Sequence, residues 1–183
     1  MIQYLLRAKH FVPDVFETSV FDVDFQTWFD SGKRVLITDL DNTLISYEDD
    51  KPTKEVLALF KKLEDIGFRI IILSNNVTQR LTVFTDGIDV EGHANARKPL
   101  LSTIKNITND IDLNEVVLMG DQLMTDIWCA KRLGVNSILV NPIKRKTEKW
   151  YTRFNRKIEQ RMLKRIKNKF PDKYQSLGLN ERR

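Results

Sequence analysis

Two aspartates separated by one residue are the side chains of this sequence best suited to chemistry. Asp39 and Asp41 directly follow a short apolar run at residues 35–38. Side chains alternate between the two faces of a strand, so both carboxylates leave this strand on the same side. Neighbouring carboxylates repel each other unless a positive charge lies between them, and Mg²⁺ prefers oxygen ligands. The spacing therefore predicts a Mg²⁺-dependent phosphoryl-transfer site.

The two aspartates can divide the reaction between them. Asp39 is the candidate nucleophile, because a carboxylate can attack phosphorus and form an aspartyl-phosphate. Asp41 is the candidate general acid and then base. Thr43 can hold Asp41 or the turn by hydrogen bonding, and we count it among the phosphate-binding residues. Taken alone, the pair is also compatible with ordinary turn and cap residues.

Further polar residues follow other apolar runs. Ser74 and Asn75 can bind phosphate oxygens together with backbone N–H groups at the start of a helix. Lys98 can neutralise both the phosphate and the carboxylates. Asp121 and Asp126 can supply metal oxygens, directly or through water. Each residue alone also suits a cap, a surface or a turn, but their joint order favours one site.

The elements that must position these residues alternate between strand and helix from residue 33 onward. The predicted strands cover residues 35–38, 68–73, 88–90 at an edge, 115–119 and 136–140. The predicted helices cover residues 54–66 and about 78–84, a segment with Pro99 in its first turn, and a segment that ends at Leu133. Repeated β-α units predict a doubly wound, mostly parallel α/β sheet with helices on both faces. Ligands bind such sheets where the strands end, and the candidate residues lie at those positions.

The bulk composition is that of one globular domain. The chain has 183 residues, of which 42% are hydrophobic and 30% charged. No apolar stretch approaches the roughly 20 residues that span a bilayer, and the first residues lack the pattern of a signal peptide. The single cysteine, Cys129, excludes an internal disulfide. We therefore expect a cytoplasmic protein.

The charge is uneven along the chain. Residues 144–183 carry 15 Lys or Arg against 4 Asp or Glu, whereas the preceding residues carry 15 basic and 21 acidic ones. We divide the chain into a lead-in packed on the core (1–32), a core (33–143) and a basic amphipathic helix with a tail (144–183). Apolar residues recur every fourth position in that last segment: Trp150, Phe154, Ile158, Met162, Ile166 and Phe170. The stripe either packs on the body, leaving a solvated basic face, or makes peripheral contact with the inner face of a membrane. Nucleic acid is a further anionic partner that this charge fits.

The motifs together resemble the haloacid-dehalogenase-like (HAD) phosphohydrolase superfamily. Asp39–Thr43 resembles its D-x-D-x-T motif, Ser74 lies in the second motif and Lys98 in the third, and Gly120–Asp126 resembles the G-D-x-x-x-x-D motif. The resemblance implies a HAD-like Rossmann-type fold. It also implies Mg²⁺ held by the side chains of Asp39 and Asp121 and the backbone carbonyl of Asp41.

A closer resemblance covers nearly all of residues 1–145. The lead-in segments 11–14 and 19–24, followed by 39–45, resemble the YqeG-type IIIA phosphatases and the related phosphatidylglycerophosphate phosphatases. The short gaps around the motifs leave no room for a cap domain, which predicts an open site suited to bulky substrates. We therefore expect a Mg²⁺-dependent phosphatase of phosphatidylglycerophosphate. The alternatives are a phosphatase of a nucleic-acid end or a soluble phosphometabolite, and a HAD-fold scaffold that binds RNA, membrane or protein.

Overall fold

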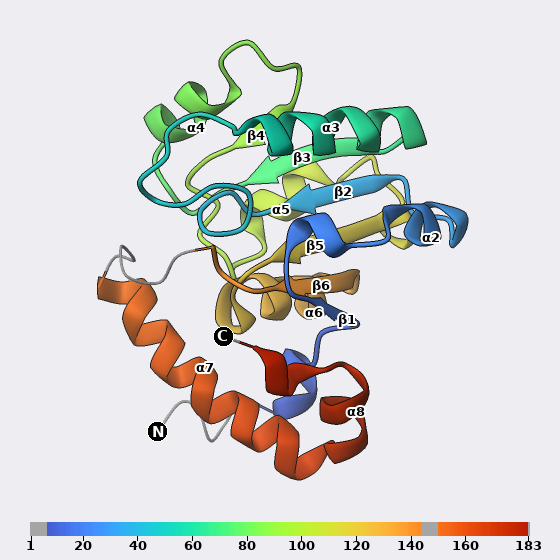
Figure 1. Ribbon diagram of the computed structural model, residues 1–183, viewed down its shortest axis with the longest axis vertical. Helices are drawn as coiled ribbons and strands as arrows, with labels where there is room; N and C mark the ends of the chain where they lie inside the picture. Colours follow the sequence, from blue (N-terminus) through green and yellow to red (C-terminus); the bar gives the residue numbers. More distant parts are fainter. Residues whose placement is uncertain (1–6, 144–149, 183) are drawn as a thin grey trace.

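A six-stranded parallel sheet forms the centre of the computed structural model, which describes residues 7–143 and 150–182 (Figure 1). The strand order is β1-β6-β5-β2-β3-β4, and each neighbouring pair is parallel. The strands are β1 (Val15–Glu17), β2 (Val35–Thr38), β3 (Arg69–Leu73), β4 (Glu91–His93), β5 (Val116–Gly120) and β6 (Asn136–Val140). This arrangement confirms the predicted parallel α/β class.

Helices cover both faces of the sheet. One face packs against α2 (Phe25–Asp30), α3 (Lys54–Ile66) and α4 (Thr78–Thr85), and the other against α5 (Ser102–Ile107) and α6 (Trp128–Leu133). The strands are apolar on both sides: in β2, Leu36 contributes to the first core and Ile37 to the second. Short turns complete the body: η1 (Ala8–Phe11), η2 (Val20–Asp22), η3 (Leu113–Glu115) and the π-helical η4 (Leu123–Ile127).

The clearest sequence signals match the structure residue for residue. Strands β2 and β6 and helix α3 have the predicted bounds. The Thr53 side chain accepts a hydrogen bond from Val56 N at 3.3 Å, which caps α3. Gly67 ends the same helix with φ +109°, a conformation that glycine adopts readily.

Predictions that rested on weaker signals were wrong in position. The edge strand next to β3 is Glu91–His93 rather than residues 88–90, because it is positioned by pairing with β3 and not by its own composition. The helix after Pro99 begins only at Ser102, so this proline is not in its first turn. The lead-in contributes an unpredicted strand, β1, which extends the sheet beyond β6.

The C-terminal segment forms α7 (Trp150–Lys169), α8 (Pro171–Ser176) and η5 (Leu179–Glu181). Figure 1 shows α7 and α8 at the β1–β6 end of the molecule, far from β4. Met162 and Ile166 are buried there with Phe11 of the lead-in, whereas Phe154 is 59% exposed. An α-helix has 3.6 residues per turn, so side chains four residues apart drift around it by about 40° per step. The stripe therefore packs on the body in its second half only; residues 144–149 and the Trp150 side chain lie outside the description.

Candidate active site

The candidate residues converge at the carboxyl ends of three adjacent strands. Asp39 follows β2, Ser74 follows β3, and Asp121 follows β5. Strand β2 lies between the other two in the sheet, so the three loops meet at one edge. The candidate residues therefore lie at the carboxyl ends of the strands, as the alternation of strands and helices predicted.

Lys98 joins two of the carboxylates. Its Nζ lies 2.7 Å from Oδ1 of Asp39 and 2.7 Å from Oδ1 of Asp126, and its side chain is 2% exposed. Burial alone would lower the pKa of Lys98, but Asp126 and Asp39 outweigh it and hold the pKa above its ordinary value. Asn75 accepts from Lys98 N at 2.7 Å and donates to Lys98 O at 3.0 Å. These contacts of Asn75 position Lys98, and its predicted role in binding phosphate stays a prediction.

Three buried carboxylates form a cluster that can hold a cation. Asp39, Asp121 and Asp126 each offer an oxygen, and these oxygens lie within 4.8 Å of one another. Thr43 Oγ1 lies 3.4 Å from both Asp39 Oδ2 and Asp121 Oδ1, which places it between the two carboxylates rather than on Asp41.

The charge balance of this cluster fits a divalent cation. Burial raises the pKa of Asp39 well above its ordinary range, Lys98 opposes this, and the charges of Asp126, Asp121 and Asp41 raise the pKa further. Lys98 alone therefore does not balance the negative charge of the buried carboxylates, and a bound cation would do so. An all-oxygen donor set of this kind suits Mg²⁺.

Gly120 allows Asp126 to enter the cluster. A Cβ atom at Gly120 would lie 2.4 Å from Asp126 Cγ, which no side chain can tolerate. Asp126 Oδ2 accepts from Gln122 N at 3.0 Å and from Thr125 Oγ1 at 3.2 Å, within the π-helical turn. Position 120 of the motif is therefore a glycine because any larger residue there would collide with Asp126.

Asp41 is held by a different set of partners. Arg80 Nε donates to its Oδ1 at 2.6 Å, while Asn76 Nδ2 and Ser74 Oγ approach its Oδ2 at 3.3 and 3.4 Å. Asn42, the next residue, has φ +65°, which turns the chain directly after Asp41. Sequence reasoning missed Asn76 and Arg80; the only available signal was an arginine in the helix that opens after the second motif.

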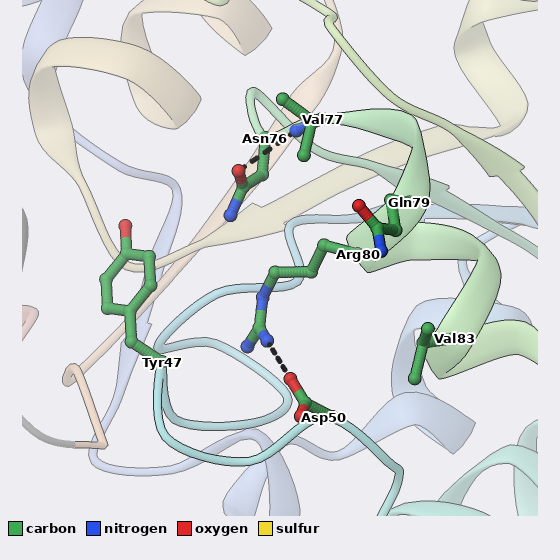
Figure 2. Close-up of a pocket in the computed structure, with 7 residues that line it drawn as sticks. All are labelled: Tyr47, Asp50, Asn76, Val77, Gln79, Arg80 and Val83. Atoms are coloured by element: carbon green, nitrogen blue, oxygen red, sulfur yellow. Dashed lines mark hydrogen bonds and ion pairs between the residues drawn. The ribbon is translucent and has the colours of Figure 1, made fainter.

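Arg80 also fixes the loop that follows Asp41. Its Nη1 donates to Asp50 Oδ1, and its Nη2 donates to the main-chain oxygens of Ser46 and Asp49, each at 2.9 Å. Figure 2 shows the Arg80 side chain reaching across a hollow toward Asp50, with Tyr47 on its other side. One guanidinium therefore ties the Asp41 carboxylate to α4 and to the loop.

Two cavities meet at this position. The smaller one, about 120 Å³, lies over the predicted residues. It is lined by Asp39, Asp41, Tyr47, Ser74, Asn75, Asn76, Lys98, Gln122, Thr125 and Asn155. The hollow in Figure 2, about 470 Å³, shares Tyr47 and Asn76 with it. The small cavity matches a transferred group, and the larger one can accommodate what is attached to that group.

The C-terminal helix reaches the same site, although most of its described basic residues are exposed, as expected of a solvated basic face. Asn155 lines the smaller cavity. Arg156 is 6% exposed and forms an ion pair with Asp121. No periodic signal distinguishes this arginine from the exposed basic residues around it, so sequence reasoning missed it.

This chain is similar to known proteins in sequence and in fold. The family model described as HAD-hydrolase-like matches residues 95–150. A protein named "Probable phosphatase YqeG" from Bacillus subtilis (strain 168) is 31% identical over 166 residues, which cover 90% of this chain and 96% of that protein. The crystal structure of an uncharacterized protein from Listeria monocytogenes serotype 4b superposes with a TM-score of 0.51. That match has 19% sequence identity, covers 63% of this chain and 85% of the other, and indicates a shared fold.

Proposed function

Because the chain belongs to the YqeG family of HAD phosphatases, we propose that Asp39 is its nucleophile, Mg²⁺ its cofactor and phosphatidylglycerophosphate its substrate. One observation carries the chemistry: Asp39 is buried at the end of a parallel strand, paired with Lys98 and beside Asp121 and Asp126. A nucleophile in this position is oriented by the sheet and lines the smaller cavity, where a substrate can reach it.

Mg²⁺ fits the carboxylate cluster described above. The side chains of Asp39 and Asp121 and the main-chain carbonyl of Asp41 would hold it, with Asp126 next to them. The ion would neutralise phosphate oxygens as negative charge develops in the transition state. Lys98, Ser74 and Thr43 contribute further donors for the same oxygens.

The reaction on the protein's own residues has two steps. An Asp39 oxygen bonds to phosphorus while the bond from phosphorus to the leaving oxygen breaks, and Asp41 gives that oxygen its proton. Asp41 then takes a proton from a water molecule that attacks the aspartyl-phosphate. The bond from phosphorus to Asp39 breaks, which releases phosphate, restores the Asp39 carboxylate and leaves Asp41 protonated, as it was before the first step.

The side on which the leaving group lies follows from Asp41. Because Asp41 protonates the leaving oxygen, the rest of the substrate lies on the Asp41 side of the site. The hollow of about 470 Å³ lies there, lined by Arg80, Tyr47 and Asn76 (Figure 2). Of the two cavities at the site, it is the one with room for a head group larger than phosphate.

The surroundings of the site support a substrate in a membrane surface. Large apolar side chains are exposed within two residues, in the sequence, of residues that line the smaller cavity: Val77 (56%) follows Asn76, Leu100 (54%) comes two residues after Lys98, and Phe154 (59%) precedes Asn155. We call Val77, Leu100 and Phe154 the apolar rim. Exposed basic residues follow along α7, namely Lys157, Arg161, Lys164 and Lys167. Exposed apolar and basic side chains together suit an anionic lipid surface, such as the inner face of the cytoplasmic membrane. None of the described helices is long and apolar enough to cross a bilayer.

The first test is phosphate release from phosphatidylglycerophosphate in mixed micelles with Mg²⁺. We expect release by the unchanged protein and none by Asp39→Asn, which should retain its circular dichroism. Asp65→Asn, at an exposed position on α3, is the matched control and should remain active.

Other outcomes separate the parts of the proposal. Asp39-dependent hydrolysis of an aryl phosphate without lipid hydrolysis would contradict the lipid substrate and favour a soluble phosphometabolite or a nucleic-acid end. Undiminished activity in Asp39→Asn would contradict the mechanism. Absence of all hydrolysis together with tight RNA binding would favour a scaffold.

A further inference from the structure

We propose that Arg156 is a positioning residue of the metal site, which holds Asp121 from the C-terminal helix so that one carboxylate oxygen faces the cluster. The inference rests on the proposed function, since it concerns the Mg²⁺ site of the same centre. It assigns to α7 a part of the active site that none of the sequence motifs contains. It also explains why Arg156 is buried on a helix whose other described basic residues are mostly exposed.

Arg156 grips Asp121 at two points. Its Nη1 donates to the main-chain oxygen of Asp121 at 2.6 Å, and its Nη2 forms an ion pair with Oδ2 of the same residue. The other carboxylate oxygen, Oδ1, lies 3.4 Å from Thr43 Oγ1, which is equally far from Asp39 Oδ2. Arg156 therefore engages the outer oxygen of Asp121 and leaves the inner oxygen directed toward the cluster.

Arg156 is itself held in place. Glu159, one turn further along α7, accepts from Arg156 Nη1 at 3.0 Å, and its other oxygen accepts from Leu123 N at 3.3 Å. Arg182 donates to Glu159 Oε1 at 2.5 Å, to Val140 O at 2.6 Å and also to Asp121 O. Glu159 thus contacts the Arg156 guanidinium directly, while Leu123 and Arg182 hold Glu159 in place.

The two buried cations Lys98 and Arg156 form ion pairs with different carboxylates of the cluster. Lys98 pairs with Asp39 and Asp126, whereas the described ion pair of Asp121 is with Arg156. A planar guanidinium can meet a carboxylate and a carbonyl at once, which fixes direction as well as charge; an ammonium acts as a point charge. Partners that hydrogen-bond to metal ligands orient those ligands, and their loss weakens metal binding.

The test measures metal binding directly in the full-length protein. Mn²⁺, which serves as a spectroscopic stand-in for Mg²⁺, is titrated into each variant, and free Mn²⁺ is followed by electron paramagnetic resonance. We expect Arg156→Gln to weaken Mn²⁺ affinity by about 10- to 100-fold. Arg156→Lys keeps the charge but not the two-point contact. Its Mn²⁺ affinity should therefore lie between those of Arg156→Gln and the unchanged protein. Lys169→Gln removes an exposed cation from the far end of the same helix and should bind as the unchanged protein does.

Circular dichroism confirms that each variant is folded, and if Arg156→Gln does not fold, Arg156→Lys decides the question alone. Unchanged affinity in a folded Arg156 variant would overturn the inference. Tighter binding would overturn it too, because Arg156 would then compete with the cation. Failure of the unchanged protein to bind Mn²⁺ would instead count against the proposed Mg²⁺ site, which keeps the two failures distinct.

Discussion

At the scale of single residues, the site separates two carboxylates that lie two positions apart in the sequence. Asp39 contacts Lys98, whereas Asp41 contacts Arg80, Asn76 and Ser74. The proposed nucleophile and the proposed acid-base residue therefore contact different cations. Each can be disturbed without the other.

Arg80 offers a way to disturb Asp41 alone. Because Arg80 ties Asp41 to α4 and to the following loop, Arg80→Gln should let the carboxylate move. We expect kcat to fall by up to about 100-fold, as misplaced catalytic groups lose rate steeply. Steady-state hydrolysis of an aryl phosphate measures this, and Arg80→Lys should recover part of the loss.

Arg69→Gln is the matched control for this experiment. Arg69 is exposed and pairs with Glu91 at the edge of the sheet, so its loss should leave kcat unchanged. Equal kcat values for Arg80→Gln and the unchanged protein would show that Arg80 does not position Asp41.

At the scale of elements, the sequence predicted correctly the helices and strands that have a clear local signal, such as a capping residue or an apolar run. Thr53 and Gly67 delimit α3, and the apolar runs of β2 and β6 are buried on both faces. The four motifs placed Asp39, Ser74, Lys98 and Asp121 at the correct edge of the sheet, because each comes directly after an identifiable strand or in a loop next to one.

Elements fixed by partners were not predictable from local patterns. Strand β1 spans three residues and β4 reads Glu-Gly-His, so both exist because β6 and β3 offer free edges. The burial of Arg156 depends on Asp121, 35 residues earlier, and no periodicity encodes such a contact. Arg80 escaped prediction for the same reason.

Helix α7 leads to a prediction about membranes. Its docked half buries Met162 and Ile166, while Phe154, the residue before Asn155, stays exposed. Phe154→Ser should weaken binding to vesicles that contain phosphatidylglycerol, because it removes an apolar group from the rim. Flotation with the vesicles measures this, and Phe21→Ser, at an exposed position outside the rim, is the control. Equal flotation of Phe154→Ser and the unchanged protein would exclude Phe154 from the contact.

At the scale of the whole molecule, the C-terminal segment is tied to the body by a buried ionic network. Burial alone would raise the pKa of Glu159, but Arg182 and Arg156 hold that pKa below its ordinary value. The folded state thus binds this proton more weakly than the unfolded state. The resulting stability is present above the ordinary glutamate value of 4.5 and is lost as pH falls below it through the folded pKa.

Glu159→Gln tests this linkage. Removing one member of a buried ion pair should cost about 3–5 kcal/mol of unfolding free energy at pH 7. The difference from the unchanged protein should shrink as pH falls below 4.5. Urea unfolding across this range measures both effects, and Glu181→Gln, at an exposed position, should follow the unchanged protein. A difference that stays constant with pH would show that the Glu159 charge does not contribute.

The distance along the chain between Asp39 and Arg156 has a consequence during synthesis. A ribosome makes Asp39, the proposed nucleophile, more than a hundred residues before Arg156, a delay of about 5–20 seconds at ordinary elongation rates. Strands β2, β3 and β5 are all synthesised before Arg156, because β5 ends at Gly120, so pairing between them does not require α7. A nascent chain at that stage contains Asp39 and Asp121 but not the contact between Arg156 and Asp121. The contact between Arg156 and Asp121 therefore forms only after α7 has been synthesised.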